Sequence, residues 1–217
     1  MCSNIFIRAH DKKLFTVLAL RISLPRGAVY LSQIRAFAMN TITALTDVAT
    51  LRANARQNID QGAITPSYSA DRVEVIKLLN EALATELVCV LRYRLHHFMA
   101  RGINSKSVAA EFLAHSIEEQ SHADQIAARI VQLGGEPDFS PDTLTARSHA
   151  EYSKGETLTE MIKANLIAER VAIDSYREMI QYLGDRDTTT SQILKGILAV
   201  EEEHADELAD LMQEHAS

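Results

Sequence analysis

Cysteine is scarce in this sequence, and long apolar runs are missing from it. Two cysteines, Cys2 and Cys89, stand in 217 residues, too few and too far apart for a disulfide framework or a four-cysteine metal site. Zinc ribbons, rubredoxin modules and iron–sulfur centres are therefore excluded, and a reducing, cytoplasmic setting is expected. No apolar stretch reaches the ~18 to 20 residues that cross a bilayer, so we expect no membrane partner.

Helix-breaking residues are also few. The chain has four prolines and eight glycines, and its hydrophobic and charged fractions, 47% and 24%, lie in the ordinary range of globular proteins. Disordered and fibrous proteins are therefore excluded. The length fits one domain with an appendage, or at most two small domains, and a helical domain is the first expectation.

Positive charge is scarce outside the first part of the chain. Residues 1–38 carry six Lys or Arg and one acid, whereas residues 39–217 carry sixteen against twenty-eight. An acidic body gives no general reason to bind nucleic acid, but it would gather cations. The basic leader is a genuine part of the protein, a targeting segment, or an upstream extension of a chain that starts at Met39. We favour the last interpretation, and the residues leave all three open.

Four long segments with helical periodicity follow an arm at residues 46–71. They run from about Asp71 to Arg101, from Ser105 or Ser107 to Leu133, from Thr157 to Leu183, and from Thr188 to His215. Their length favours a helix bundle, since the mean globular helix has only ~11 to 12 residues. Short turns follow the first and third helices, and the long second connection fits a crossover. We predict a leader and arm over residues 1–70 and a four-helix bundle over residues 71–217.

Each predicted helix has one buried stripe of residues spaced alternately three and four apart. Every stripe is apolar towards its ends and acidic in its middle. The members are Ile76, Leu79, Leu83, Glu86, Val90, Tyr93 and His97 in the first helix; Phe112, His115, Glu119, His122 and Ile126 in the second; Ile162, Asn165, Glu169, Ala172 and Tyr176 in the third; and Leu194, Ile197, Glu201, His204, Leu208 and Leu211 in the fourth.

The polar residues at the stripe centres share one height along the bundle. In each hairpin a glutamate precedes the turn by about seventeen residues, and an ExxH motif begins about fifteen or sixteen residues after it. At ~1.5 Å rise per residue, all of them lie roughly 25 Å from the turns. The pattern therefore occurs twice, with Glu86, Glu119 and His122 in the first hairpin and Glu169, Glu201 and His204 in the second.

Four carboxylates buried together need cations, because each charge taken from water costs several kcal/mol and the four repel one another. If two glutamates bridge two divalent ions, each ion receives about three protein ligands and keeps positions open for water or oxygen. Oxygen and imidazole ligands without thiolate favour iron or manganese over structural zinc. A single ExxH arises readily by chance, whereas two copies at matched heights with a partner glutamate each do not.

Other polar residues near the stripes have simpler interpretations. We expect Glu118, Glu202 and Glu203 to be solvated surface groups. His97 and His115 are expected to be hydrogen-bonded histidines at the stripe ends, and Tyr93 and Tyr176 to pack in the core.

The four ligand-bearing segments resemble the ferritin-like superfamily, and bacterioferritin in particular. They are VIKLLNEALATELVCVLRY at 75–93, HSIEEQSHAD at 115–124, NLIAERVAIDSYREMI at 165–180 and ILAVEEEHADEL at 197–208. The resemblance implies an all-α, ferritin-like antiparallel four-helix bundle with a long crossover and two iron ions per subunit, manganese being the alternative metal. It implies that Tyr93 hydrogen-bonds within the site. It assigns terminal ligands to Glu86 and Glu169, bridging ligands to Glu119 and Glu201, and one imidazole per iron to His122 and His204.

Three departures from the family pattern modify these expectations. Gln120 replaces the methionine that ligates haem, so haem is not expected. Only thirteen residues follow His204, which is short for the fifth helix of twenty-four-subunit shells. A twelve-subunit shell resembling the Dps-like proteins is therefore favoured, with the larger shell as the alternative. Asn165 and Val200 stand where bacterioferritins often place acids, so Asn165 is expected around the site and an outer path for protons or iron is in doubt.

The resemblance implies a ferroxidase that oxidises Fe(II) with dioxygen or hydrogen peroxide and stores Fe(III) in a homo-oligomeric shell. Two alternatives stay open. A manganese catalase, a rubrerythrin-like peroxidase or a hydroxylase would keep the metal site without a shell, although the four-cysteine module of rubrerythrin is missing. A Dps-type protein that protects DNA would use the basic leader as its binding arm.

Overall fold

The computed structural model describes residues 45–102 and 105–215. The predicted basic leader at residues 1–38 and the alternative start at Met39 lie outside this part. The chain divides into two compact units, Met1–Val48 and Ala49–Ser217. The second unit holds the helical bundle, and the predicted boundary at residue 71 stays a prediction. Within the described ranges, no helix is long and apolar enough to span a membrane.

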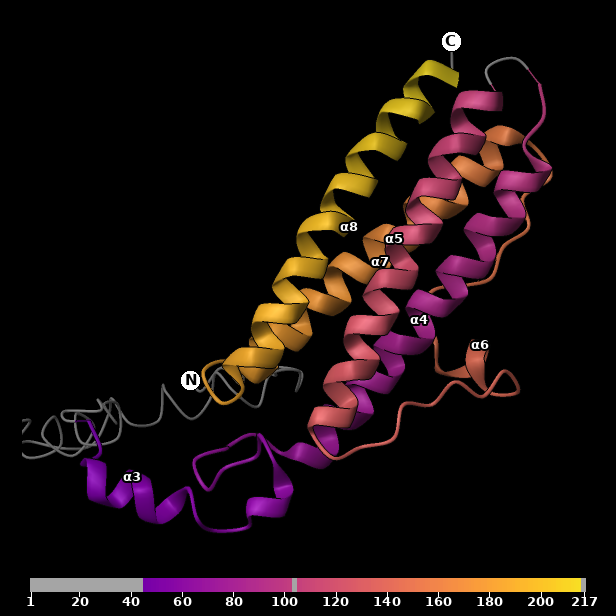
Figure 1. The fold of residues 1–217 in the computed structure, drawn as a ribbon. Helices are drawn as coiled ribbons and strands as arrows, with labels where there is room; N and C mark the ends of the chain where they lie inside the picture. Colours follow the sequence, from indigo (N-terminus) through magenta and orange to yellow (C-terminus); the bar gives the residue numbers. More distant parts are fainter. Residues whose placement is uncertain (1–44, 103–104, 216–217) are drawn as a thin grey trace, which may run out of the picture. The chain divides into compact units, whose positions relative to one another are not determined.

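Four long helices make up the bundle (Figure 1). They are α4 (Arg72–Met99), α5 (Ser105–Gln132), α7 (Leu158–Leu183) and α8 (Thr188–His215). Three short helices accompany them: α3 (Val48–Asn54), the 3-10 turn η1 (Ile59–Gln61) and α6 (Leu144–Arg147). The described residues contain no strand, and the predicted all-α bundle is confirmed.

Local sequence signals set the helix ends. The side chain of Asp71 accepts hydrogen bonds from the backbone N–H groups of Val73 and Glu74, and so caps α4. At α7, Thr157 and Glu160 exchange hydrogen bonds in a capping box. Such caps satisfy N–H groups that have no partner inside the helix and contribute about 1 kcal/mol each. At the other end of α7, Gly184 takes a positive φ of 51°, a conformation that favours glycine.

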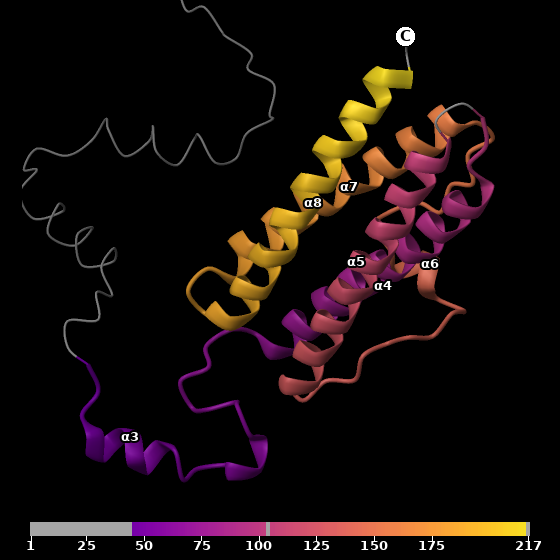
Figure 2. The same ribbon diagram turned by 45° about the horizontal axis from the view of Figure 1, so that its top comes forward.

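The helices pair as two antiparallel hairpins, α4 with α5 and α7 with α8, and the hairpins meet through α4–α7 and α5–α8 contacts. Figure 2 shows the two hairpins side by side. The connection from α5 to α7 runs back along the bundle, and its helix α6 packs on α4. The sequence predicted this crossover but not the short helix within it.

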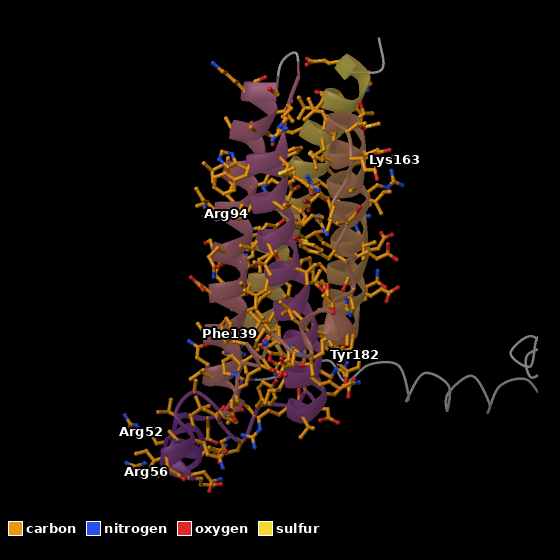
Figure 3. The ribbon with its side chains drawn as sticks, turned by 90° about the vertical axis from the view of Figure 1, so that its right-hand side faces the viewer. Arg52, Arg56, Arg94, Phe139, Lys163 and Tyr182 are labelled. Atoms are coloured by element: carbon orange, nitrogen blue, oxygen red, sulfur yellow. The ribbon has the colours of Figure 1, made fainter. Side chains whose placement is uncertain are left out.

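The described core has two large apolar clusters, which polar side chains separate along the bundle, and a small third one where α6 packs on α4. One cluster includes Leu79, Leu83, Ile126, Ile130 and Leu194, all at most 1% exposed. The other is built around Tyr93, Phe112, Ile162 and Leu208, all fully buried. Figure 3 shows the side chains that fill the space between the helices, while the labelled Lys163 points outward. Burial of each such side chain stabilises the fold by about 1.5 to 3 kcal/mol, and the apolar clusters hold the polar layer between them.

The buried face of α4 is wider than the predicted stripe. Val90 and His97, expected inside, are only half-buried, whereas Arg92 and His96 are fully buried. The crossover explains the burial of these two side chains. Arg92 donates a hydrogen bond to the Glu151 carbonyl, and Nε2 of His96 contacts the Ser153 carbonyl. Helical periodicity reports burial against neighbouring helices, and it does not report burial against an irregular segment such as this one.

A buried ion pair closes the end of the bundle where α8 begins. The guanidinium of Arg129 on α5 donates to Asp187 at 2.9 Å and to the Thr190 hydroxyl at 2.8 Å. Asp187 also accepts from the backbone N–H of Thr190 and from the Tyr68 hydroxyl. Every oxygen of this carboxylate is therefore occupied, which is the condition under which a buried ion pair is tolerated.

Candidate metal centre

The six residues of the duplicated pattern come together in the polar layer, from four different helices. Each is at most 4% exposed. They are Glu86 on α4, Glu119 and His122 on α5, Glu169 on α7, and Glu201 and His204 on α8. The i, i+3 spacing of Glu and His places both side chains on one helix face, so each ExxH motif points into the bundle as a unit.

The side chains form two overlapping groups of potential ligands. One group contains Glu86 and His122, the other contains Glu169 and His204, and both share Glu119 and Glu201. Within each group, one ligand atom per residue lies within 4.8 Å of all the others. Two cations could therefore share the two central carboxylates while each keeps a glutamate and an imidazole of its own.

Both histidines turn Nδ1 towards the carboxylates. Nδ1 of His122 lies 3.0 Å from Glu201, 3.3 Å from Glu119 and 3.5 Å from Glu86. Nδ1 of His204 lies 3.8 Å from Glu201 and 4.0 Å from Glu119. A single ring nitrogen cannot hydrogen-bond several carboxylates at once, so this convergence is better suited to a cation than to a hydrogen.

Glu118 has a role that its expected surface position did not indicate. It is exposed, but its carboxylate lies 2.7 Å from Nε2 of His204. A carboxylate on the outer nitrogen fixes the ring orientation and the tautomer of a ligand histidine, and it raises the basicity of the inner nitrogen. Glu202 and Glu203 are exposed, as expected.

Buried polar atoms without hydrogen-bond partners are concentrated in this layer. An unsatisfied buried polar group costs about 1 to 3 kcal/mol, and more when charged, so such atoms are rare in folded proteins. Their concentration at one point indicates that a ligand belongs there. Among the described residues they are Glu86 Oε2, Glu119 Oε1, Glu169 Oε2, both carboxylate oxygens of Glu201, and Nδ1 of His204.

The same crowding shifts the pKa values in the cation-free protein. Burial and the neighbouring carboxylates raise the pKa of Glu119 and of Glu169 well above the ordinary value. For Glu201 the effect of burial is outweighed by the imidazoles of His122 and His204, which hold its pKa below the usual range. For His122, burial is outweighed by the contacts with Glu201 and Glu86, which raise its pKa to about 10. In the cation-free protein, the raised pKa values of Glu119, Glu169 and His122 therefore favour bound protons, which reduce the negative charge of the layer.

Two tyrosines hydrogen-bond the two glutamates that belong to one ligand group only, and each tyrosine contacts the glutamate of the other hairpin. The Tyr93 hydroxyl donates to Glu169, and the Tyr176 hydroxyl donates to Glu86. Each tyrosine follows the glutamate of its own helix by seven residues, and each serves the glutamate of the other hairpin. Tyr176 had been expected to be core packing alone. The spacing from Glu169 to Tyr176 repeats the spacing from Glu86 to Tyr93, and this repeat could have identified Tyr176 as a residue of the site.

Asn165, one turn before Glu169 on α7, is fully buried and hydrogen-bonds two side chains of α4. Its side-chain oxygen accepts from Nε of Arg92 at 2.8 Å, and its amide nitrogen lies 3.0 Å from Nδ1 of His96. Arg92 makes its other contacts with Cys89 Sγ and the Glu151 carbonyl. All three of these hydrogen-bond partners of the buried guanidinium are neutral groups. Its positive charge therefore offsets part of the negative charge of the carboxylate layer.

The two histidines at the stripe ends differ. Nδ1 of His97 lies 2.7 Å from the Ala109 carbonyl, as expected of a satisfied boundary residue. His115 is 1% exposed, contacts the Tyr93 hydroxyl through Nδ1 at 3.2 Å and stacks on His204 with ring centroids 3.9 Å apart. Burial and the neighbouring His204 lower its pKa to about 4, so its imidazole is neutral at pH 7.

Gln120, which replaces the haem-ligating methionine in the predicted scheme, is half-buried on α5. Its amide donates to Asp124 one helical turn further on, at 3.0 Å. This side chain offers an amide in place of a thioether, so the expectation that haem does not bind stays a prediction supported by the chemistry of the donor.

A four-helix bundle with a Glu and an ExxH motif contributed twice to its centre is the arrangement that ferritin-like carboxylate proteins share. Residues 76–216 match the ferritin-like domain of the ferritin family. The chain therefore belongs to the ferritin family.

Relatives and solved structures agree with this assignment. Bacterioferritin BfrA of Mycobacterium tuberculosis is 33% identical over 136 residues, which cover 62% of this chain and 81% of the relative. A dodecameric thioferritin of Bacteroides fragilis, a bacterioferritin-related protein, superposes with a TM-score of 0.66 at 32% identity and covers 68% of this chain and 89% of its own. Rhodobacter capsulatus bacterioferritin, whose structure has a metal-free dinuclear site and haem iron, gives a TM-score of 0.60 at 29% identity, over 68% and 88%.

Proposed function

We propose that this protein is a ferroxidase that oxidises Fe(II) at the six-residue centre and stores the Fe(III) in a shell of identical subunits. One observation carries the proposal: five carboxylate oxygens and one imidazole nitrogen without hydrogen bonds converge in the middle of a ferritin-family bundle. Such a layer of buried carboxylates favours bound cations, and oxygen and nitrogen donors without thiolate suit iron.

The overlap of the two ligand groups supports a division of roles. Glu86 and Glu169, each present in one group only, would be terminal ligands. The shared carboxylates of Glu119 and Glu201 would bridge the two ions. His122 and His204 would bind one ion each through Nδ1. Cys89 belongs to neither group, and burial raises the pKa of its thiol.

The reaction takes one electron from each of two Fe(II) ions. Dioxygen accepts the two electrons with two protons and becomes hydrogen peroxide, or hydrogen peroxide accepts them with two protons and becomes two waters. The bound substrate ions supply the electrons, and the protein holds them close enough to act as a pair. Tyr93 and Tyr176 hold the terminal carboxylates in position by their hydrogen bonds. The acidic body attracts Fe(II) to the subunit.

A shell of twelve subunits is the assembly that we propose, and the dodecameric protein of Bacteroides fragilis supports it. A twenty-four-subunit shell is the alternative. Native mass measurement separates the two, and a monomer or dimer would contradict storage within a shell. Elemental analysis of the purified protein distinguishes iron from manganese.

The oxidation itself is tested by adding Fe(II) and then dioxygen or hydrogen peroxide to the metal-free protein and following the ferric absorbance. We expect the initial rate to fall at least ~100-fold in Glu119→Ala and in His204→Ala, because each change removes a ligand of the centre. Glu203→Ala is the matched control, since it removes an exposed carboxylate from the same turn of α8. Wild-type rates in both ligand variants would contradict the proposal.

A further inference from the structure

The two ligand groups of the centre differ in what lies behind their histidines. The ring of His204 is held from outside, because its Nε2 lies 2.7 Å from the Glu118 carboxylate. A carboxylate only accepts hydrogen bonds, so Nε2 carries a hydrogen and Nδ1 is the nitrogen left to bind an ion. In the repeated pattern, the residue that corresponds to Glu118 is Val200, which also precedes the glutamate of its ExxH motif. Valine accepts no hydrogen bond, and within the described residues the polar contacts of His122 are all made through Nδ1.

The two groups also differ in how many of their donor atoms are free. In the group that contains Glu169 and His204, each of the four residues has at least one buried donor atom without a hydrogen bond. Nδ1 of His204 lies 3.8 Å from Glu201 and 4.0 Å from Glu119, too far for a hydrogen bond. Nδ1 of His122, by contrast, lies 3.3 Å from Glu119, within hydrogen-bond distance, and 3.0 Å from Glu201. An ion that binds His122 must first break these contacts, whereas Nδ1 of His204 has no hydrogen bond to lose.

One buried charge acts in the opposite direction. The guanidinium of Arg92 lies 5.6 Å from the ring centroid of Tyr93, whose hydroxyl donates to Glu169, so its positive charge repels an ion bound to that glutamate. Within the described part of the chain, however, the hydrogen bonds of Arg92 reach none of the six ligand residues. Glu118 contacts a ligand directly, and an outer contact of this kind is worth about 10- to 100-fold in metal affinity. We therefore expect the direct contacts to decide which position binds an ion more tightly.

We propose that the two positions of the centre are inequivalent, and that the position formed by Glu169, His204 and the two shared carboxylates binds the first divalent cation. Glu118 is the positioning residue that sets this order, because it holds His204 from outside. The inference rests on the proposed function and deepens it, since it says which ion of the pair binds first. The second ion binds Glu86 and His122 when the shared carboxylates already contact the first ion, and repulsion between the two ions widens the difference in affinity. The second ion is therefore the one that exchanges more readily.

The order is tested by titrating the metal-free, full-length protein with Co(II), which binds nitrogen and oxygen ligands. Calorimetry and the visible absorption of bound Co(II) follow the two binding steps. We expect two steps whose dissociation constants differ at least ~10-fold. Glu169→Gln should lose the tighter step and Glu86→Gln the weaker one, because each substitution removes a ligand of one position only. Glu203→Gln, which removes an exposed carboxylate from α8, is the control and should change neither step.

The positioning role of Glu118 is tested in the same two backgrounds, where a single position remains. Added to Glu86→Gln, Glu118→Gln should weaken the binding of the remaining Co(II) by about 10- to 100-fold and shift its absorption band, because the ring of His204 loses its outer carboxylate. Added to Glu169→Gln, the same substitution should leave the affinity and the band unchanged. A general loss of structure would affect both backgrounds alike.

The outcomes separate this inference from the proposed function. Two equal steps in the wild type, or loss of the tighter step in Glu86→Gln, would refute the order of binding and leave the metal centre standing. Equal effects of Glu118→Gln in both backgrounds would refute its positioning role. If neither Glu86→Gln nor Glu169→Gln alters Co(II) binding, the six residues do not form the metal centre, and the proposed function fails together with the inference.

Discussion

The metal-free protein should lose stability as the pH rises above neutrality, because His122 holds a proton that the unfolded chain releases. The imidazole lies within 3.5 Å of the carboxylates of Glu86, Glu119 and Glu201. These contacts raise its pKa from 6.5 to about 10 in spite of its burial. A raised pKa contributes stability that is fully present below pH 6.5 and is lost as the pH rises towards 10.

The magnitude follows from the linkage between protons and folding. Between pH 7 and pH 9 the folded protein binds one proton at His122 that the unfolded chain does not bind. Each pH unit in this interval therefore removes about 1.4 kcal/mol, and two units remove about 2.7 kcal/mol. The raised pKa values of Glu119 and Glu169 act in the same direction, because unfolded glutamates have already released their protons at pH 7.

Guanidinium chloride unfolding in the presence of EDTA, at fixed subunit concentration and at pH 7, 8 and 9, measures this loss. His122→Gln should flatten the slope by about one proton, whereas His149→Gln, which removes a histidine outside the centre, should leave it unchanged. Saturating Co(II) should reverse the trend, because the cation replaces the protons and binds the folded state only. A metal-free wild type with constant or rising stability over this pH range would refute the reasoning.

Three further changes test individual contacts. Tyr176→Phe removes the hydroxyl that donates to Glu86 and should slow Fe(II) oxidation by about 10-fold while the fold is kept, as judged by circular dichroism. Glu118→Gln removes the carboxylate that orients His204 and should weaken Co(II) binding at the centre by about 10- to 100-fold in a calorimetric titration. Asp187→Ala leaves a buried guanidinium without its partner and should lower the free energy of unfolding by about 3 to 5 kcal/mol; a loss below about 1 kcal/mol would contradict the account of this ion pair.

The helices were predictable because each has a strong local signal. Apolar residues three and four apart mark the buried stripe, and Asp71, Thr157 and Gly184 mark helix ends whose caps the structure contains. The convergence of the central residues was also predictable, because equal distances from two turns bring ExxH motifs to one height. Their role as metal ligands stays a prediction until metal binding is measured.

Contacts that depend on a segment without periodicity could not be predicted. The crossover between α5 and α7 covers α4 and buries Arg92 and His96 against its backbone carbonyls. No spacing rule says where such a segment will lie. Glu118 was missed for a related reason, since its position on the outer side of α5 does not reveal that its side chain reaches His204 on α8.

The sequence by itself determined the number of long helices, their order and the two halves of one ligand pattern, because helical periodicity and turn positions are local properties of the chain. The tertiary structure decided which atoms of those residues meet. Only the packing of α5 against α8 brings His115 to Glu207 and His204, and only the approach of the two hairpins joins Tyr93 to Glu169. Side-chain contacts between helices depend on the rotation of each helix about its axis, which packing sets and spacing along the chain does not.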